Sequence, residues 1–346
     1  MLITFACRHP AGSGKFTPDK SSGQKAEFLI MAYFKKVHPI LQLLIFAGMA
    51  IGCFMIFGLI GTFVLAKASG MDLLTLSDPD KWDYTDPALL TFLRGMLVIQ
   101  FFALFIIPVF LFARFCDSRP TQYLGLRSVK PLYILLGMTV LIVALPFVDW
   151  TGTINHELIP ETTTIGKWMK TSEEAAAKQI GFMLKRSSVK DLLLNLVFVA
   201  LFAGVGEELF FRGVIQRLFI KLFKNPWAGI LVTAFIFSAI HLQFYGFIPR
   251  FILGILLGLI YWYSGSLWPA IIAHFAYDAF AVVMIWFNPA LAEEESVAVS
   301  LGNKSVLAAI SLALIIGIVI IMKKRSTNSY EAVYARDNID ESNPFA

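Results

Sequence analysis

LLLNLVFVALFAGVGEELFFRG, residues 192–213, is the stretch that decides how this chain folds. Residues 192–205 form an apolar run of the kind that lies in lipid, and Glu207, Glu208 and Arg212 follow it. Ionisable side chains at membrane depth cost about 2.5–3.5 kcal/mol each on insertion scales, so by default they mark a functional site. The stretch therefore predicts a membrane helix that carries functional polar groups.

Helical geometry separates the roles of the two adjacent glutamates. Successive residues of a helix point about 100° apart, so Glu207 and Glu208 face different ways. Glu208 and Arg212 are four residues apart on one face, in the favoured order of acid before base. We therefore expect Glu208 and Arg212 to pair, and Glu207 to be aimed at another part of the chain.

The composition excludes a soluble protein. The chain has 346 residues, of which 57% are hydrophobic and only 15% charged, whereas soluble proteins carry about 25% charged residues. Long apolar runs that cross lipid satisfy their backbone hydrogen bonds as helices, so the chain is predicted to be an all-α, polytopic integral membrane protein. The net charge of +5 comes from Lys and Arg at the ends of apolar runs, so we expect membrane lipid and not nucleic acid as a partner. The three cysteines, Cys7, Cys53 and Cys116, form no metal or redox pattern.

The apolar runs predict about eight transmembrane helices. The third span is expected to end at Pro146 and Asp149, and a polar segment, 151–188, follows it, in which 171–185 is amphipathic and suited to the membrane interface. The predicted spans are 40–66, 92–115, 132–148, 191–223, 227–242, 247–263, 267–287 and 306–322.

The loops between the spans alternate between basic and acidic, which predicts the orientation in the membrane. The basic loops near 116–130 and 213–225, with both termini, are placed in the cytoplasm, and the acidic loops near 67–86 and 288–304 face outward. We expect a multi-pass protein of the cell membrane, and the basic, Phe-rich chain is typical of a bacterial protein.

The chain divides into four parts. Residues 1–30 are interpreted as a disordered tail or as an extension before a start at Met31. The other parts are the N-terminal spans with the polar loop, 31–190, a catalytic membrane domain, 191–287, and the last span with a disordered cytoplasmic tail, 288–346.

Further polar groups fall in the apolar runs after Glu207. Phe237 and His241 are four residues apart, as are His274 and Asp278, so each pair shares a helix face. Any one buried histidine is as readily a packing residue, and the Glu208–Arg212 pair by itself can be a structural lock. Taken together, the set predicts one polar chamber within the membrane.

The chemistry of such a chamber leaves two arrangements open. In the first, Glu207 and His241 activate a water molecule, because an apolar chamber makes a carboxylate a stronger base. His274 and a protonated Asp278 then donate hydrogen bonds to the oxyanion, or an ionised Asp278 orients His274. In the second, Glu207, His241 and His274 bind a catalytic zinc ion. The sequence has no His-Glu-x-x-His pair, so we favour the arrangement without metal or other cofactor.

Three motifs resemble those of a known family. Glu207-Glu208-x-x-x-Arg212, Phe237-x-x-x-His241 and His274-x-x-x-Asp278 are similar to the motifs of the CPBP intramembrane metalloprotease-like family, which includes the type II CAAX prenyl endopeptidases and the lysostaphin-resistance protein A-like proteins. The resemblance covers about residues 191–287. It implies a glutamate-dependent membrane-embedded endopeptidase, and it places individual residues in roles. By this resemblance Glu207 would be the base, acting with His241. His274 and Asp278 would form the oxyanion site. Glu208, Arg212 and Phe237 would support them.

The substrate and the competing functions are also expectations. A membrane-associated peptide or protein, such as a pheromone-like precursor, is favoured over a farnesylated CAAX tail, because most bacteria do not prenylate proteins. The alternative is a non-catalytic immunity or scaffold protein that binds a partner through the same chamber or through 151–188. A proton- or ion-coupled transporter is the weakest hypothesis, since the sequence shows no inverted repeat.

Overall fold

The computed structural model describes residues 34, 37–158, 162–184, 188–292, 303–330 and 333. The expectations for the 1–30 tail, the start at Met31, the outward loop beyond 292 and the end of the C-terminal tail lie outside these residues. The helices are α2 (Pro39–Ser69), α3 (Leu73–Leu76), η2 (Pro79–Lys81), α4 (Pro87–Gln100), η3 (Phe101–Ile106), α5 (Ile107–Cys116), α6 (Pro120–Tyr123), α7 (Pro131–Leu158), α8 (Thr164–Leu184), α9 (Val189–Asn195), η4 (Leu196–Leu201), α10 (Phe202–Glu207), η5 (Glu208–Gln216), α11 (Arg217–Phe223), α12 (Pro226–Ala239), α13 (Phe247–Ser264), α14 (Trp268–Phe287), η6 (Pro289–Ala292) and α15 (Lys304–Arg325).

The all-α, polytopic membrane architecture is confirmed. Within the described residues there is no strand, and seven helices are long and apolar enough to cross a membrane. They start where the sequence supplies caps, as at α4, where the side chain of Asp86 accepts a hydrogen bond from Ala88 N and Pro87 occupies the first turn. Seven of the eight predicted spans correspond to these helices. The remaining one, the fifth predicted span (227–242), corresponds to α12, which is a shorter apolar helix.

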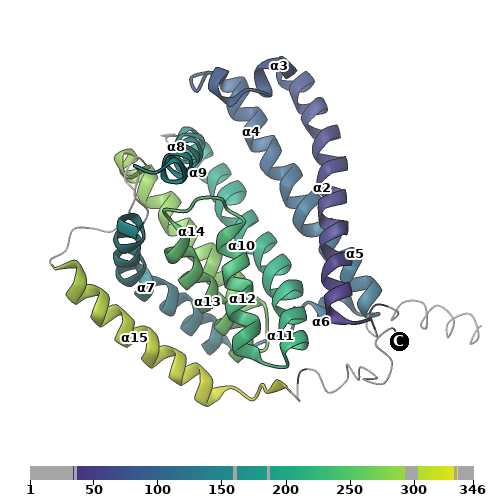
Figure 1. Ribbon diagram of the computed structural model, residues 1–346, viewed down its shortest axis with the longest axis vertical. Coiled ribbons are helices and arrows are strands. Elements are labelled where there is room, and N and C mark those ends of the chain that lie inside the picture. The colour runs from purple at the N-terminus through teal and green to yellow at the C-terminus, as the bar shows by residue number, and fades with distance from the viewer. Residues whose placement is uncertain are drawn as a thin grey trace, which may run out of the picture.

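The helices form a bundle with one pair leaning away from it (Figure 1). That pair is α2 and α4, joined at one end through α3. In the rest of the molecule α7 packs against α13, α14 and α15, and α12 packs against α13. Many apolar side chains of α2 are exposed, including Leu44, Ile51 and Leu59, and a surface of this kind is suited to lipid.

Residues 192–213 lie in one continuous helix, Val189–Phe223, which we call the motif helix. It comprises α9, η4, α10, η5 and α11. Its segments η4 and η5 are wound as π-helix, a rare winding that often occurs at functional sites. All nine residues of η5, from Glu208 to Gln216, are buried, so the charged part of the motif helix lies inside the bundle.

The third predicted span was too short. Helix α7 continues through Pro146 to Leu158, and Thr151 and Asn155, which the prediction placed in a polar segment, are buried on it. A proline inside a membrane helix is tolerated because neighbouring groups satisfy the freed backbone. The polar residues here serve packing: Asn155 Nδ2 donates to the carbonyl oxygens of Phe244 and Tyr245. The next helix, α8, is likewise longer than the predicted 171–185.

The fifth predicted span was too long, and this changes the setting of His241. Helix α12 ends at Ala239, and Leu242 has φ of +55°, which breaks the helix. His241 therefore lies just beyond a helix end and not within a helix. Its Nδ1 bonds the carbonyl oxygen of Phe237 at 2.7 Å, so the side chain caps one of the open carbonyls of the last turn.

Glycines let the helices around the motif helix approach closely. A Cβ atom at Gly204 would lie 2.9 Å from the backbone nitrogen of Phe275 on α14. A Cβ at Gly258 of α13 would lie 2.7 Å from Oε1 of Gln216. Both distances are too short for a real Cβ contact. At Gly204 the neighbour is backbone, so only glycine permits this spacing between the motif helix and α14, whereas at Gly258 the side chain of Gln216 would have to move.

Candidate functional site

A cavity of about 190 Å³ lies between the motif helix, α7, α13, α14 and the end of α12. The four side chains predicted as catalytic, Glu207, His241, His274 and Asp278, all line it. Thus three motifs separated by up to 71 positions in the chain meet at one place (278 − 207). The cavity is lined by Leu141, Ala203, Glu207, Phe237, His241, Arg250, Leu253, Leu257, His274, Tyr277 and Asp278.

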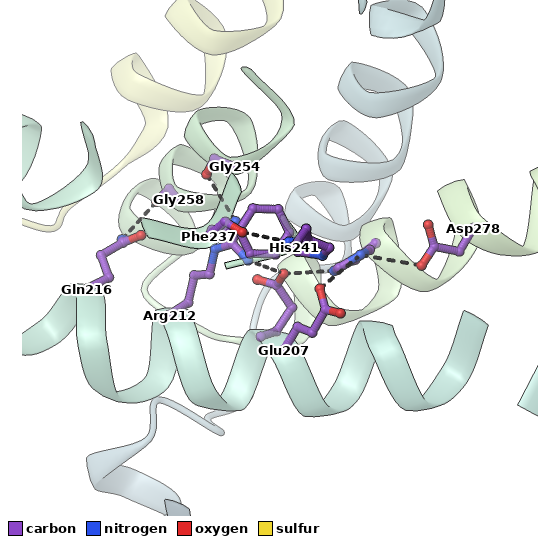
Figure 2. A network of polar contacts seen from close by, with 10 residues as sticks. Glu207, Arg212, Gln216, Phe237, His241, Gly254, Gly258 and Asp278 are labelled. Atoms are coloured by element: carbon purple, nitrogen blue, oxygen red, sulfur yellow. Dashed lines mark hydrogen bonds and ion pairs between the residues drawn. The ribbon is translucent and has the colours of Figure 1, made fainter. Parts of the chain in front are cut away.

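Beneath the cavity, Glu208 and Arg212 form the predicted pair, which is confirmed. Arg212 Nη1 donates to Glu208 Oε1 at 2.6 Å, and both side chains are fully buried. Arg212 also donates to the carbonyl oxygen of Gly254 at 3.1 Å, and its guanidinium lies 4.7 Å from the ring centroid of Phe237 (Figure 2). The pair therefore joins the motif helix to α12 and α13 as well as stabilising the helix itself.

His274 lies among three carboxylates, which spacing along the chain did not predict. Its Nδ1 is 2.9 Å from Glu208 Oε1, and its Nε2 is 3.4 Å from Asp278 Oδ2 and 4.0 Å from Glu207 Oε2. An ionised Glu208 can only accept hydrogen bonds, so His274 Nδ1 carries the proton of that bond. Glu208 is thus more than a partner of Arg212, because it also holds the ring of His274.

His241 presents its other nitrogen for chemistry. The carbonyl oxygen of Phe237 can only accept, so Nδ1 of His241 is the donor in their 2.7 Å bond. This bond selects the tautomer in which Nε2 is unprotonated. The ring of Phe237 packs against both histidines, with centroid separations of 5.1 Å to His241 and 6.4 Å to His274.

Glu207 takes no part in the buried Glu208–Arg212 pair, as its place on the helix predicts. Its side chain is 17% exposed, compared with 0% for Glu208, and it borders the cavity. Glu207 is near the middle of the motif helix, Val189–Phe223, so its carboxylate lies far from either end of that span. An acidic group in this position has access to a small, partly apolar cavity.

One residue of the cavity wall, Arg250, has no place in the predicted site. It lies in the first turn of α13, and its guanidinium donates to the side chain and the main-chain carbonyl of Gln243. In the sequence, Arg250 is visible only as a lone arginine at the fourth position of the predicted span 247–263. No acidic residue lies three or four positions away from it, so helical spacing gave no reason to assign it a role. Its proximity to Glu207 and His241 depends on how α13 folds back along α12.

The zinc arrangement of Glu207, His241 and His274 can be tested against the side-chain positions. Among the residues that the structure describes, no group of three or more His, Cys, Asp or Glu side chains is arranged to hold a metal ion. The two nitrogens of His274 instead face carboxylates, and His241 bonds a carbonyl through Nδ1. In these positions the described side chains do not form a metal site, and zinc dependence stays a prediction that the chelator experiment tests.

Comparison with known proteins gives the class to which this site is similar. A family model described as type II CAAX prenyl endopeptidase Rce1-like matches residues 189–280, a stretch that contains all three motifs. This match confirms the resemblance to the CPBP family.

A curated relative adds no function. The uncharacterized protein YpbD of Bacillus subtilis (strain 168) is 30% identical over 112 residues, which are 31% of this chain and 54% of YpbD. The chain thus spans about half the length of this relative. No solved structure matches the chain.

Proposed function

We propose that this protein is an intramembrane endopeptidase that hydrolyses peptide bonds of membrane-associated substrates with a water molecule activated by Glu207 and His241. The observation that carries the proposal is the cavity itself. It places a carboxylate, an unprotonated imidazole nitrogen and the His274–Asp278 pair around one space near the middle of a membrane span. The match of residues 189–280 to an endopeptidase family supports the same reaction class.

In the first half of the reaction, water is deprotonated and attacks the substrate. Glu207, together with His241 Nε2, takes a proton from the water as its oxygen forms a bond to the carbonyl carbon. The electron pair of the carbonyl π bond moves onto the oxygen and forms a tetrahedral oxyanion. A cavity this small and shielded favours such a step because it holds the water against the carbonyl and strengthens electrostatic interactions.

In the second half, the tetrahedral intermediate collapses. The carbon–nitrogen bond breaks, and the leaving amine receives the proton that Glu207 and His241 had taken up. His274 and Asp278 form the wall at which we place the substrate carbonyl. Asp278 donates a hydrogen bond only in its protonated form and otherwise orients His274 through their 3.4 Å contact.

The proposed substrate is a peptide or protein segment held at the membrane. Leu141, Leu253 and Leu257 give the cavity apolar walls beside its polar residues, which suits a hydrophobic segment of the substrate. The matching family is described as prenyl endopeptidases. For this chain we propose the wider class of membrane-associated peptides, with or without a lipid chain.

The test compares the purified wild type with Glu207→Gln and His241→Ala on a library of membrane-embedded peptides, each with and without chelator. We expect cleavage by the wild type, a loss of at least about 100-fold in kcat for both variants, and no effect of chelator. Thermal unfolding in detergent serves as the control that the variants are folded.

Two results would contradict this mechanism. Loss of cleavage with chelator, restored by zinc, would make Glu207, His241 and His274 metal ligands. Full activity of Glu207→Gln in cells that need the protein would instead support the non-catalytic immunity or scaffold function. That variant keeps the shape of the glutamate and one acceptor oxygen, but it replaces the other oxygen with an NH2 donor and removes the charge and basicity.

A further inference from the structure

Arg250 is the one permanent cation among the described side chains that line the cavity. It lies in the first turn of α13 and shares the wall with Glu207 and His241. The charges of Glu173 and Glu207 act on its guanidinium. An arginine inside the hydrocarbon region is costly, and such residues face a cavity or a functional partner.

The structure fixes the position of this guanidinium. Its two terminal nitrogens donate to Gln243, one to the side-chain oxygen and one to the main-chain carbonyl. Gly246 provides the space, because a Cβ atom there would lie 2.6 Å from Nη2 of Arg250. The bend between α12 and α13 therefore holds the cation against the cavity wall.

The bonds to Gln243 leave part of the guanidinium without a partner. Within the described part of the chain, Nε of Arg250 is buried and has no hydrogen-bond partner. Gln243 is neutral, so its two bonds carry no counter-charge; the charges that act on the guanidinium are those of Glu173 and Glu207. A buried charged group with an unmet donor is unfavourable, and this cost is recovered when an anionic oxygen reaches it.

The ring nitrogens of the two cavity histidines already face protein oxygens, so an additional donor would help to hold an oxyanion beside the His274–Asp278 wall. His274 directs Nδ1 to Glu208 and Nε2 towards Asp278 and Glu207, so carboxylates already face both nitrogens. His241 uses its one N–H on a backbone carbonyl. Arg250 differs from both because its charge does not depend on a proton equilibrium and because its buried Nε has no hydrogen-bond partner among the described residues.

We propose that Arg250 stabilises the oxyanion of the tetrahedral intermediate, with Gln243 and Gly246 as the residues that position it. This inference rests on the proposed peptidase function. As water bonds to the carbonyl carbon, the π electron pair moves to the carbonyl oxygen, and the guanidinium donates a hydrogen bond to that oxygen. When the carbon–nitrogen bond breaks, the pair returns to the carbonyl and the hydrogen bond weakens. No proton leaves Arg250 in either step.

The experiment measures kcat and KM for the full-length protein in liposomes, with the wild type, Glu207→Gln, Arg250→Gln and Arg127→Gln. Loss of one oxyanion donor lowers kcat by about 100- to 1000-fold, so we expect that fall for Arg250→Gln with little change in KM. Arg127 lies on an exposed loop, where it donates to the carbonyl oxygen of Gln122, and Arg127→Gln should match the wild type.

A second variant, Gly246→Ala, keeps the positive charge of Arg250 but shifts its guanidinium. Gly246→Ala forces the end of the flexible Arg250 side chain to shift, without a clash against backbone. The φ of Gly246, −95°, is open to alanine, so the variant should fold. We expect its kcat to fall roughly 10- to 100-fold, because small misplacements of a catalytic group are costly. Should Arg250→Gln fail to fold, this variant decides the question.

A pair of substrates distinguishes stabilisation of the oxyanion by Arg250 from binding of the substrate's C-terminal carboxylate by Arg250. The same peptide is supplied with a free carboxylate at its C-terminus and with an amide there. An oxyanion role predicts the same fall in kcat on both. A rise in KM confined to the carboxylate form would show that Arg250 binds the substrate's end group and would overturn the inference.

The remaining outcomes distinguish the two proposals. Wild-type kcat in both Arg250→Gln and Gly246→Ala, with Glu207→Gln inactive, overturns the role of Arg250 and leaves the peptidase function standing. Cleavage by Glu207→Gln at the wild-type rate overturns the activation of water by Glu207, on which the inference rests. No cleavage by the wild type overturns the peptidase function and the inference together.

Discussion

At the scale of single residues, one oxygen atom connects the motifs. Oε1 of Glu208 accepts from Arg212 at 2.6 Å and from His274 at 2.9 Å. The bond to Arg212 could be predicted because the two residues share a helix face four positions apart. The bond to His274 spans 66 positions and depends on how α14 lies against the motif helix, so no spacing in the sequence reveals it.

The burial of this pair predicts a large stability effect. Glu208→Gln leaves the fully buried Arg212 without its counter-charge, and removal of one partner of a buried ion pair costs about 3–5 kcal/mol. We expect a clearly lower unfolding temperature in detergent, measured by intrinsic fluorescence.

The matched control is Lys81→Gln, which removes an exposed partner. Lys81 Nζ lies 2.9 Å from Asp78 Oδ2, but its side chain is 67% exposed, and pairs of this kind contribute about 0–1 kcal/mol. Equal unfolding temperatures for the two variants would refute the structural role of Glu208.

At the scale of elements, the contact between the motif helix and α14 sets the site. Gly204 lies one turn before Glu207, and it meets the backbone of Phe275, the residue next to His274. A side chain of Phe275 could rotate away from an added methyl group, whereas its backbone cannot. The absence of a Cβ at Gly204 therefore controls how closely His274 approaches the glutamates.

Gly204→Ala tests this contact. Overpacking of a close interface typically costs about 1–3 kcal/mol, and here it would also move α14 and lengthen the His274–Glu208 bond. We expect lower stability together with lower cleavage activity.

A glycine in open space gives the control. A Cβ atom added at Gly317 of α15 would meet no described atom within 4 Å, so Gly317→Ala should be neutral or stabilising by up to about 1 kcal/mol. Equal effects of the two substitutions would show that the Gly204 contact is not a constraint.

At the scale of the whole molecule, charge predicts how the protein is oriented. Basic loops favour the cytoplasm, and Ser118 lies in such a loop, close to Arg114 and Arg119. Ser77 lies in the acidic loop between α2 and α4. Both serines are exposed, so a reagent can reach either position once it is on the correct side.

Cysteine labelling tests the orientation in a background without the native cysteines. Ser77→Cys should react with a membrane-impermeant maleimide in intact cells, and Ser118→Cys only after lysis. Both substitutions are conservative and exposed, so they control for one another. The reverse pattern would invert the predicted orientation of these two loops.

The sequence alone determined the architecture and identified Glu207, His241, His274 and Asp278, which line the cavity. Apolar run length predicts helices because backbone groups in lipid must be satisfied within the segment. Helical spacing also predicts the Glu208–Arg212 pair and the faces of His274 and Asp278, since these relations lie within one helix. The limits of this reasoning appear at Pro146, which α7 passes through, and at His241, which lies beyond the end of α12.

The tertiary structure alone decided which groups meet and what each bonds. It brings Arg250 to the cavity, directs His274 to Glu208, and sets the tautomer of His241 through the carbonyl of Phe237. These relations depend on how closely helices pack and where a chain bends between them. The contacts that determine both, such as Gly204 against the backbone of Phe275, join distant positions and leave no periodic pattern along the chain.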